Sequence, residues 1–280
     1  MFDTIEKIDH SVVQHGPISD RIYLMKLSDQ DLPDLLDKLD RLAEQQDYSK
    51  IFAKAPLPVK EMFASHDYVE EASVPGFYKG QTDGVFLAKY IDPQREREPA
   101  QKKIEHIIDL SEEKAKQAEP EIPDGPLTIR PLEESDAEAL AEVYQEGFES
   151  YPFPIHEPDY LLETMASHVA YFGAFDENRL VAAGSAEIDS EAQNAEMTDF
   201  ATLPDYRGQG LAQQLLVTME QYMRNRGIKT GYTIARALSA GMNITFAKHG
   251  YQFAGTLTNN THIYGGIESM NVWYKSLSGN

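Results

Sequence analysis

The sequence feature that most constrains the fold is a glycine-containing turn between a predicted strand and a predicted helix. It reads Leu-Pro-Asp-Tyr-Arg-Gly-Gln-Gly-Leu-Ala over residues 203–212. A strand-like run precedes it at 196–202, and an apolar-periodic helix begins near Gly210. Glycines allow a ligand to approach the backbone closely, and the first amides of a helix have no acceptor inside it. The turn therefore predicts an anion-binding cradle at a helix N-terminus.

The charges around this turn also favour an anion. Arg207 adds a planar guanidinium, which suits phosphate oxygens. Between Tyr206 and His249 there are six Lys and Arg residues and one acid, Glu220, within a chain of net charge −21. The alternative is a purely structural turn with a glycine at each unusual dihedral angle. The local positive charge favours a phosphate-bearing ligand instead.

The turn resembles the motif of a known family. Arg207, Gly210 and Ala212 form the pattern Arg-x-x-Gly-x-Ala, and Pro204 stands just before it. With a strand upstream and a helix downstream, this pattern resembles the acetyl-CoA motif of the GNAT N-acetyltransferase superfamily. A Walker A loop would need Gly-Lys-Ser/Thr, which the chain lacks, and a dinucleotide fingerprint would need a third glycine. The resemblance implies acetyl-CoA as the co-substrate.

The order of predicted elements in the C-terminal part agrees with this resemblance. Apolar periodicity predicts strands at 127–132, 169–175, 180–188, 195–203, 229–235, 251–258 and 267–274, and helices from 137 and at 159–168, 211–226 and 242–249. GNAT domains have their elements in this order. We therefore predict an α/β (α+β) protein with the GNAT fold and a mixed, mostly antiparallel central sheet.

The N-terminal part is predicted to be a smaller α/β unit, residues 1–91, that resembles a degenerate half of a GNAT domain. Its predicted strands are 21–27, 50–55, 68–77 and 84–90, with helices around 32–42 and 59–65. The similarity lies in short segments, 51–55 and 63–68 against 233–237 and 246–251, so chance is the alternative. Ser-Asp-Gln-Asp at 28–31 stands where the cradle would be. We expect no CoA site in this unit.

Composition sets the domain boundaries and excludes several functions. Residues 92–125 are rich in Glu, Lys, Gln and Pro and predict a linker with one helix, followed by a GNAT domain at 126–280. The chain has no cysteine and its eight His are scattered, so we expect no disulfide, Cys nucleophile or metal site. The net charge of −21 disfavours nucleic acid and anionic membranes as partners. Without a signal pattern or a long apolar run, we expect a cytoplasmic protein.

The resemblance also implies where acetyl-CoA binds. It places the co-substrate in a V-shaped split between the strands at 195–203 and 229–235, with the thioester carbonyl near the backbone of 200–202. The implied cofactor-binding residues are Phe200, Ala201, Thr202, Arg207, Gly208, Gln209, Gly210, Leu211, Ala212, Asn243 and Phe246. Phe246 stands where many members carry a tyrosine that protonates the thiolate. Tyr264 and Tyr274 are alternative donors, although a thiolate with a pKa of about 8.5 also leaves unaided.

Acetyl transfer to an alkylamine needs a base, because an ammonium has no lone pair and its solution pKa is about 10.4. The resemblance implies that Glu196, six residues before Thr202, is this base, as in the histone-acetyltransferase branch. A solvated carboxylate at the end of a strand is the alternative. Asp199 is the second choice, since it faces the other side of the strand unless a bulge intervenes.

Polar segments in the C-terminal strands carry a narrower resemblance. Residues 239–243, 259–261 and 265–274, together with 50–54 and 76–80, resemble the β-lysine Nε-acetyltransferases, whose product is a compatible solute. This resemblance extends over nearly the whole chain. It implies an acid for the non-reacting amine of β-lysine and amide or hydroxyl donors for its carboxylate. The candidates are Glu187, Asp189 and Glu268 for the amine, and Asn243, Asn260, Ser269 and Asn271 for the carboxylate.

Other functions remain open at this point. Each of these asparagines also suits a turn. The acceptor could instead be lysine, a polyamine or a protein N-terminus, and a non-catalytic module that senses CoA is a further alternative. GNAT domains often pair through their terminal strands, so a homodimer is possible. A duplicated unit could also pair within one chain.

Overall fold

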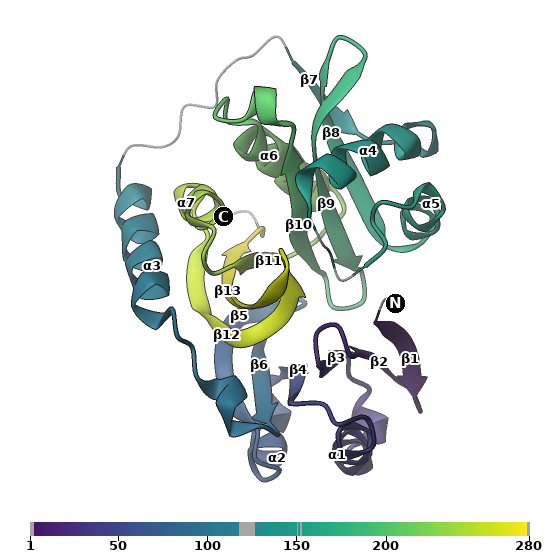
Figure 1. The fold of residues 1–280 in the computed structure, drawn as a ribbon, viewed down its shortest axis with the longest axis vertical. Helices are drawn as coiled ribbons and strands as arrows, with labels where there is room; N and C mark the ends of the chain where they lie inside the picture. Colours follow the sequence, from purple (N-terminus) through teal and green to yellow (C-terminus); the bar gives the residue numbers. More distant parts are fainter. Residues whose placement is uncertain (1–2, 118–126, 150, 152, 279–280) are drawn as a thin grey trace.

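The structure is a computed structural model that describes residues 3–117, 127–149, 151 and 153–278. Within that part of the chain, thirteen strands form one continuous sheet. The first six strands make up one half of this sheet, which lies at the bottom of Figure 1, and the other seven make up the second half. The predicted boundary between residues 125 and 126 lies outside the described residues.

The N-terminal half contains six strands and two helices. Its strands are β1 (Thr4–Ile8), β2 (Ser11–Gly16), β3 (Arg21–Lys26), β4 (Lys50–Pro56), β5 (Val69–Tyr78) and β6 (Thr82–Tyr90). Helix α1 (Asp34–Gln46) connects β3 to β4, and α2 (Lys60–Ala64) follows β4. The leucine face of α1 is buried, as its spacing predicts. Strands β1 and β2 were not among the expected elements, and β1 is almost wholly exposed.

The C-terminal half follows the predicted order closely. Its strands are β7 (Thr128–Pro131), β8 (Val169–Asp176), β9 (Arg179–Asp189), β10 (Asn194–Thr202), β11 (Thr230–Arg236), β12 (Gln252–Ile263) and β13 (Gly266–Ser276). Its helices are α4 (Ala137–Gly147), α5 (Pro158–Ser167), α6 (Leu211–Asn225) and α7 (Ala240–Lys248). The large core of this half lies between the sheet and these helices. The GNAT element order and the mostly antiparallel sheet are confirmed.

The two halves repeat one strand order. Read from its outer edge, the N-terminal half runs β1-β2-β3-β4-β6-β5, and the C-terminal half runs β8-β9-β10-β11-β13-β12, with β7 added outside β8. The parallel pairs also correspond, because β3–β4 and β10–β11 are both parallel, with α1 and α6 as their connecting helices. A duplicated unit would have this arrangement.

Strands β10 and β11 separate partway along their length. They pair at Asn194–Thr230, Ala195–Gly231 and Glu196–Tyr232, and no further pair follows, although β10 continues to Thr202. Beyond Tyr232, β11 pairs only with β13 on its other side. The split that the resemblance implied between these two strands is therefore present.

The halves of the sheet meet where β5 and β12 pair, at Ala72 and Gly255. A Cβ atom on Gly255 would lie 2.0 Å from the carbonyl oxygen of Glu71, so only glycine fits at this contact. Beside it, the fully buried Lys50 places its Nζ 2.9 Å from Glu71 Oε2 and donates to the Thr258 carbonyl at 2.7 Å. The two halves are thus joined by backbone pairing and by hydrogen bonds from the buried Lys50–Glu71 ion pair of the N-terminal half to the backbone of Thr258.

The segment after β6 connects both halves a second time. Arg95, in a 3-10 turn at Pro93–Glu96, donates to the carbonyls of Ser19 and Asn259, both at 2.7 Å. Helix α3 (Gln101–Ala115) then packs against α7, as Figure 1 shows. None of the described helices is long and apolar enough to cross a membrane.

Candidate active site

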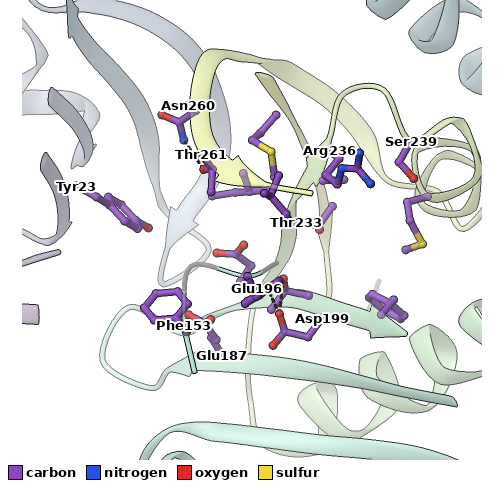
Figure 2. A pocket seen from close by; sticks show the side chains of 18 of the residues that line it. Tyr23, Phe153, Glu187, Glu196, Asp199, Thr233, Arg236, Ser239, Asn260 and Thr261 are labelled. Carbon is purple, nitrogen blue, oxygen red and sulfur yellow. Dashed lines mark hydrogen bonds between the residues drawn. The ribbon is translucent and has the colours of Figure 1, made fainter. Parts of the chain in front are cut away.

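A cavity of about 160 Å³ lies where the split between β10 and β11 faces the N-terminal half. Strands β2, β3 and β4 line one side of it, and β9, β10 and β11 line the other. Figure 2 shows Glu196 near the middle, Tyr23 and Glu187 to one side, and Arg236 to the other. Both halves of the chain therefore contribute to one site.

Two glutamates face each other in this cavity. Glu187 on β9 and Glu196 on β10 are direct partners across the antiparallel pair. Like charges at such positions repel each other. Burial, and then the charges of Glu196 and Asp199, raise the pKa of Glu187 to about 8. Glu187 is therefore mostly protonated at neutral pH.

Glu196 has neighbours that favour its charged form. Burial raises its pKa, but Lys54 and a hydrogen bond with Tyr232 oppose this shift. Lys54 Nζ lies 3.1 Å from Tyr232 Oη. Burial alone would lower the pKa of Lys54, yet Tyr23, Tyr232 and Glu196 outweigh it, so Lys54 stays charged. Lys54 and Tyr232 therefore favour the charged form of Glu196, and Glu187 has no such hydrogen bond among the causes of its shift.

Asp199 reaches the same cavity because of a bulge. The β9–β10 register shifts between Thr198 and Ala201, and Asp199 has a φ of 56°. The extra residue cancels the alternation that would otherwise point Asp199 to the opposite face. Its carboxylate accepts hydrogen bonds from Tyr151 and Ser185, and burial raises its pKa. These bonds occupy both oxygens, so Asp199 suits a positioning role better than proton transfer.

The predicted cradle lies at the end of β10. Gly208 and Gly210 have φ angles of 78° and 74°, and a Cβ on Gly208 would face open space. Arg207 Nε donates to the Thr202 carbonyl at 3.1 Å. After Arg207, the next amide in this described segment to donate to the backbone is Gln213, to Gly210 at 3.1 Å. The amides of 208–212 are therefore available to an anion, as a CoA diphosphate requires.

Comparison with known proteins agrees with this geometry. The sequence model described as "Acetyltransferase (GNAT) family" matches residues 137–251. The chain is 38% identical over 273 residues to the Beta-lysine N(6)-acetyltransferase of Methanococcus maripaludis, covering 98% of each chain. This chain belongs to the GNAT acetyltransferase family. It is an enzyme that transfers an acetyl group to nitrogen, with acetyl-CoA as the co-substrate.

Two further relatives of this acetyltransferase match over most of their length. The Beta-lysine N(6)-acetyltransferase of Methanosarcina mazei is 33% identical over 260 residues, covering 85% of this chain and 95% of that one. The N-acetyltransferase YodP of Bacillus subtilis is 32% identical over 276 residues, covering 95% and 96%. The similarity thus includes the N-terminal half as well as the GNAT domain.

The other residues predicted to contact acetyl-CoA lie in several parts of the acetyltransferase structure. Phe200 and Phe246 line the cavity and pack edge to face, with ring centroids 5.7 Å apart. Ala201 and Leu211 are buried in the core, so only their backbone can contact a ligand. The remaining predicted residues, Thr202, Gln209 and Ala212, belong to the strand end, the turn and the first turn of α6.

Asn243 and Asn271 lie in the core rather than on the cavity. The Asn243 amide donates to the carbonyls of Arg236 and Ser239, at 3.0 and 2.8 Å. Its oxygen accepts from Asn271 and from Trp273, at 2.8 and 2.9 Å. Both side chains are fully buried and neither lines the cavity. The side chains of both asparagines are thus bonded within the protein, and their roles as ligands stay predictions.

Glu268 and Ser269 are also occupied by contacts within the protein. Glu268 forms a two-point ion pair with Arg236, at 2.7 and 2.9 Å. Ser269 donates to Glu98 and accepts from the Asn259 amide. Neither residue lines the cavity, and Asp189 caps the turn that follows β9. Of the predicted acceptor-binding residues, Glu187 and Asn260 do line it.

The two tyrosines considered as proton donors lie away from the cavity. Tyr264 is 55% exposed and stacks on Arg236, and Tyr274 donates to Gln252 at 2.8 Å. Sequence reasoning also missed the contribution of the N-terminal half. Gln14, Arg21 and Tyr23 line the cavity although no local motif marks them. Among the described residues, no group of three or more His, Asp or Glu could hold a metal ion.

Proposed function

We propose that this acetyltransferase acetylates the ε-amine of β-lysine in the cytoplasm, forming the compatible solute Nε-acetyl-β-lysine. Two relatives that match most of the chain are named for this activity. The observation that carries the proposal is the opposed pair Glu187 and Glu196, half-buried in a cavity that both halves line. Half-buried acids that repel each other suit a cationic amine, whose charge relieves the repulsion.

Glu196 is proposed as the general base. A carboxylate with a raised pKa accepts a proton more readily than an ordinary one, and Lys54 keeps Glu196 charged until the ammonium arrives. Loss of the proton frees the nitrogen lone pair. Glu187, largely protonated, and Asp199, held by Tyr151 and Ser185, then fix the position of Glu196 and the amine.

Acetyl-CoA supplies an acyl carbon, which forms a bond to nitrogen as its bond to sulfur breaks. CoA leaves as a thiolate, and the second proton of the nitrogen neutralises it. The amides of 208–212 and the Arg207 guanidinium would hold its diphosphate, because they are free to donate at the N-terminus of α6. The split between β10 and β11 leaves room beside Phe200 for the acyl arm. The donor therefore approaches from the cradle side, and the acceptor occupies the cavity beyond Glu196.

The proposal is tested by competition between acceptors. Purified protein with acetyl-CoA is assayed with β-lysine, α-lysine and spermidine, and the acetylated nitrogen is located by NMR. We expect the highest kcat/KM for β-lysine and acetylation at its ε-nitrogen. A higher kcat/KM for α-lysine or spermidine would contradict the proposed acceptor, and acetylation of the β-nitrogen would contradict the proposed orientation.

A further inference from the structure

Three buried polar groups in the acceptor cavity have no hydrogen-bond partner within the described chain. They are Gln14 Nε2, Arg21 Nε and Asn260 Oδ1, in residues only 2%, 4% and 1% exposed. All three residues line the cavity. An unpaired buried polar group destabilises the folded state, and such groups are rare in folded proteins. Three in one cavity indicate that a ligand supplies their partners.

The three groups come from both halves of the sheet. Gln14 lies on β2 and Arg21 on β3, whereas Asn260 lies on β12. Arg21 Nη1 donates to the Asn260 carbonyl at 2.6 Å and to Thr261 Oγ1 at 3.0 Å. Its guanidinium also lies over the rings of Tyr23 and Phe52. These contacts hold the guanidinium in place, so the free Nε has a defined direction.

The kinds of unpaired group specify the kind of ligand. Gln14 Nε2 and Arg21 Nε are donors, whereas Asn260 Oδ1 is an acceptor. A carboxylate satisfies two donors, and a neighbouring ammonium satisfies one acceptor. An amino acid carries both groups within one or two carbon atoms of each other. A polyamine offers only cations and would leave both donors unpaired.

The charge distribution in the cavity agrees with such a ligand. Burial, and then the nearby Arg95, lower the pKa of Arg21 only to about 10, so Arg21 is charged at neutral pH. The acids Glu187, Glu196 and Asp199 line the same cavity from β9 and β10. An anionic group of the ligand is favoured beside Arg21, and its far amine is favoured beside Glu196.

We propose that Gln14 and Arg21 bind the carboxylate of the acceptor and that Asn260 accepts a hydrogen bond from its adjacent ammonium. The N-terminal half thereby selects an amino acid over a simple diamine. This inference rests on the proposed function, because it assigns the end of the acceptor that does not react. It names binding residues only, and the proton transfer at Glu196 is unchanged.

The test compares β-lysine with pentane-1,4-diamine, which is the same diamine without the carboxylate. In Gln14→Leu we expect the KM for β-lysine to rise about tenfold, with kcat and the KM for the diamine nearly unchanged, because one hydrogen bond to a charged group is lost. Gln14 Nε2 has no partner among the described residues, so the described fold loses no hydrogen bond of that atom. Gln46→Leu, at an exposed site on α1, is the matched control.

A second variant tests the acceptor group. Asn260→Asp keeps an oxygen for the ammonium but places a negative charge beside the carboxylate, so preference should shift from β-lysine toward the diamine. If both variants keep the wild-type preference, the inference is overturned. A preference of the wild type for α-lysine over β-lysine would contradict the proposed function. The inference would still stand if the wild type favoured each amino acid over its decarboxylated diamine and if the variants lost this preference.

Discussion

The two halves of the sheet have the same strand order but differ at corresponding positions. The third residue pair of the parallel strands is Tyr23–Phe52 in one half and Glu196–Tyr232 in the other, and Tyr23, Phe52 and Glu196 line the cavity. The position of the proposed base is thus a tyrosine in the N-terminal half. A shared topology fixes where side chains point, and the residue type decides which half performs the chemistry.

The turns that follow β3 and β10 differ even more. After β10 the chain has Arg207, Gly208 and Gly210, with free amides at the start of α6. After β3 it has Asp29 and Asp31, and the Asp31 carboxylate is bound by the His10 amide and by Ser11. Acids at this position repel phosphate. Under the proposed function, the C-terminal half binds the donor, and the N-terminal half contributes only to binding the acceptor.

The largest expected effect comes from the two corresponding positions in the parallel strands. Glu196→Gln removes the proposed base, so kcat should fall by about 100-fold or more while the affinity for acetyl-CoA is retained. Tyr23→Phe, at the corresponding position in β3, should lower kcat by less than about tenfold, since no proton is transferred there. Steady-state kinetics and calorimetric titration of acetyl-CoA measure both. Equal losses in the two variants would remove the distinction between the halves.

The junction between the halves should give the next largest effect. In Gly255→Val the new side chain meets the Glu71 carbonyl, so β5 and β12 must separate, at a cost of about 3 kcal/mol. Urea unfolding measures the cost. The KM for the amine should rise more than the KM for acetyl-CoA. In the proposed complex the amine contacts both halves, whereas acetyl-CoA contacts only the C-terminal half. Gly266→Ala, where no atom lies within 4 Å of the added Cβ, is the control.

A smaller effect is expected when the turn after β10 receives an acid like those in the corresponding turn after β3. Gly208→Asp introduces the acid found after β3 and should raise the KM for acetyl-CoA about tenfold through repulsion of the diphosphate. Gly227→Asp is a matched control, because Gly227 has a φ of 77° and open space around it, but lies after the C-terminal end of α6. The same rise in KM in both variants would show backbone strain rather than repulsion.

The smallest effect concerns stability. Because burial, Glu196 and Asp199 raise the pKa of Glu187 from 4.5 to about 8, the folded protein binds more protons than the unfolded chain between these values. The contribution of Glu187 to the free energy of unfolding is therefore fully present below pH 4.5 and is lost as pH rises through 8. Glu187→Gln should raise the melting temperature by about 4 °C at pH 9 and change it little at pH 5. Glu191→Gln, at an exposed site beyond β9, should show no such gain.

The sequence predicted the parts of the fold that depend on local pattern. Residues 203–212 contain the turn and the helix start, β10 ends just before them at Thr202, and the structure places these elements as expected. Asp199 was expected to share a face with Glu196 only if a bulge intervened in the strand, and the structure has this bulge. The alternation of polar and apolar residues in β10 breaks at Thr198 and Asp199, but sequence alone did not show whether a bulge causes this break.

The contribution of the N-terminal half could not be predicted in the same way. Arg21 appeared only as the first residue of a strand, and its burial depends on Asn260 and Thr261, more than 200 residues away. The contacts of Asn243 could not be predicted for a related reason. Its polar pattern suggested a ligand, but its partners Asn271 and Trp273 belong to a strand formed later in the chain. Such contacts follow from the order of the whole sheet.

The pairing of β5 with β12 inside one chain has a consequence for how such a site can change over time. In a symmetric dimer of identical subunits, every substitution occurs on both sides of the interface. Here the two sides are encoded separately. Selection can therefore act on Arg21 for the proposed binding of the acceptor and independently on Arg207 for the proposed binding of the donor. Covalent fusion thus permits a division of labour that identical subunits could not evolve.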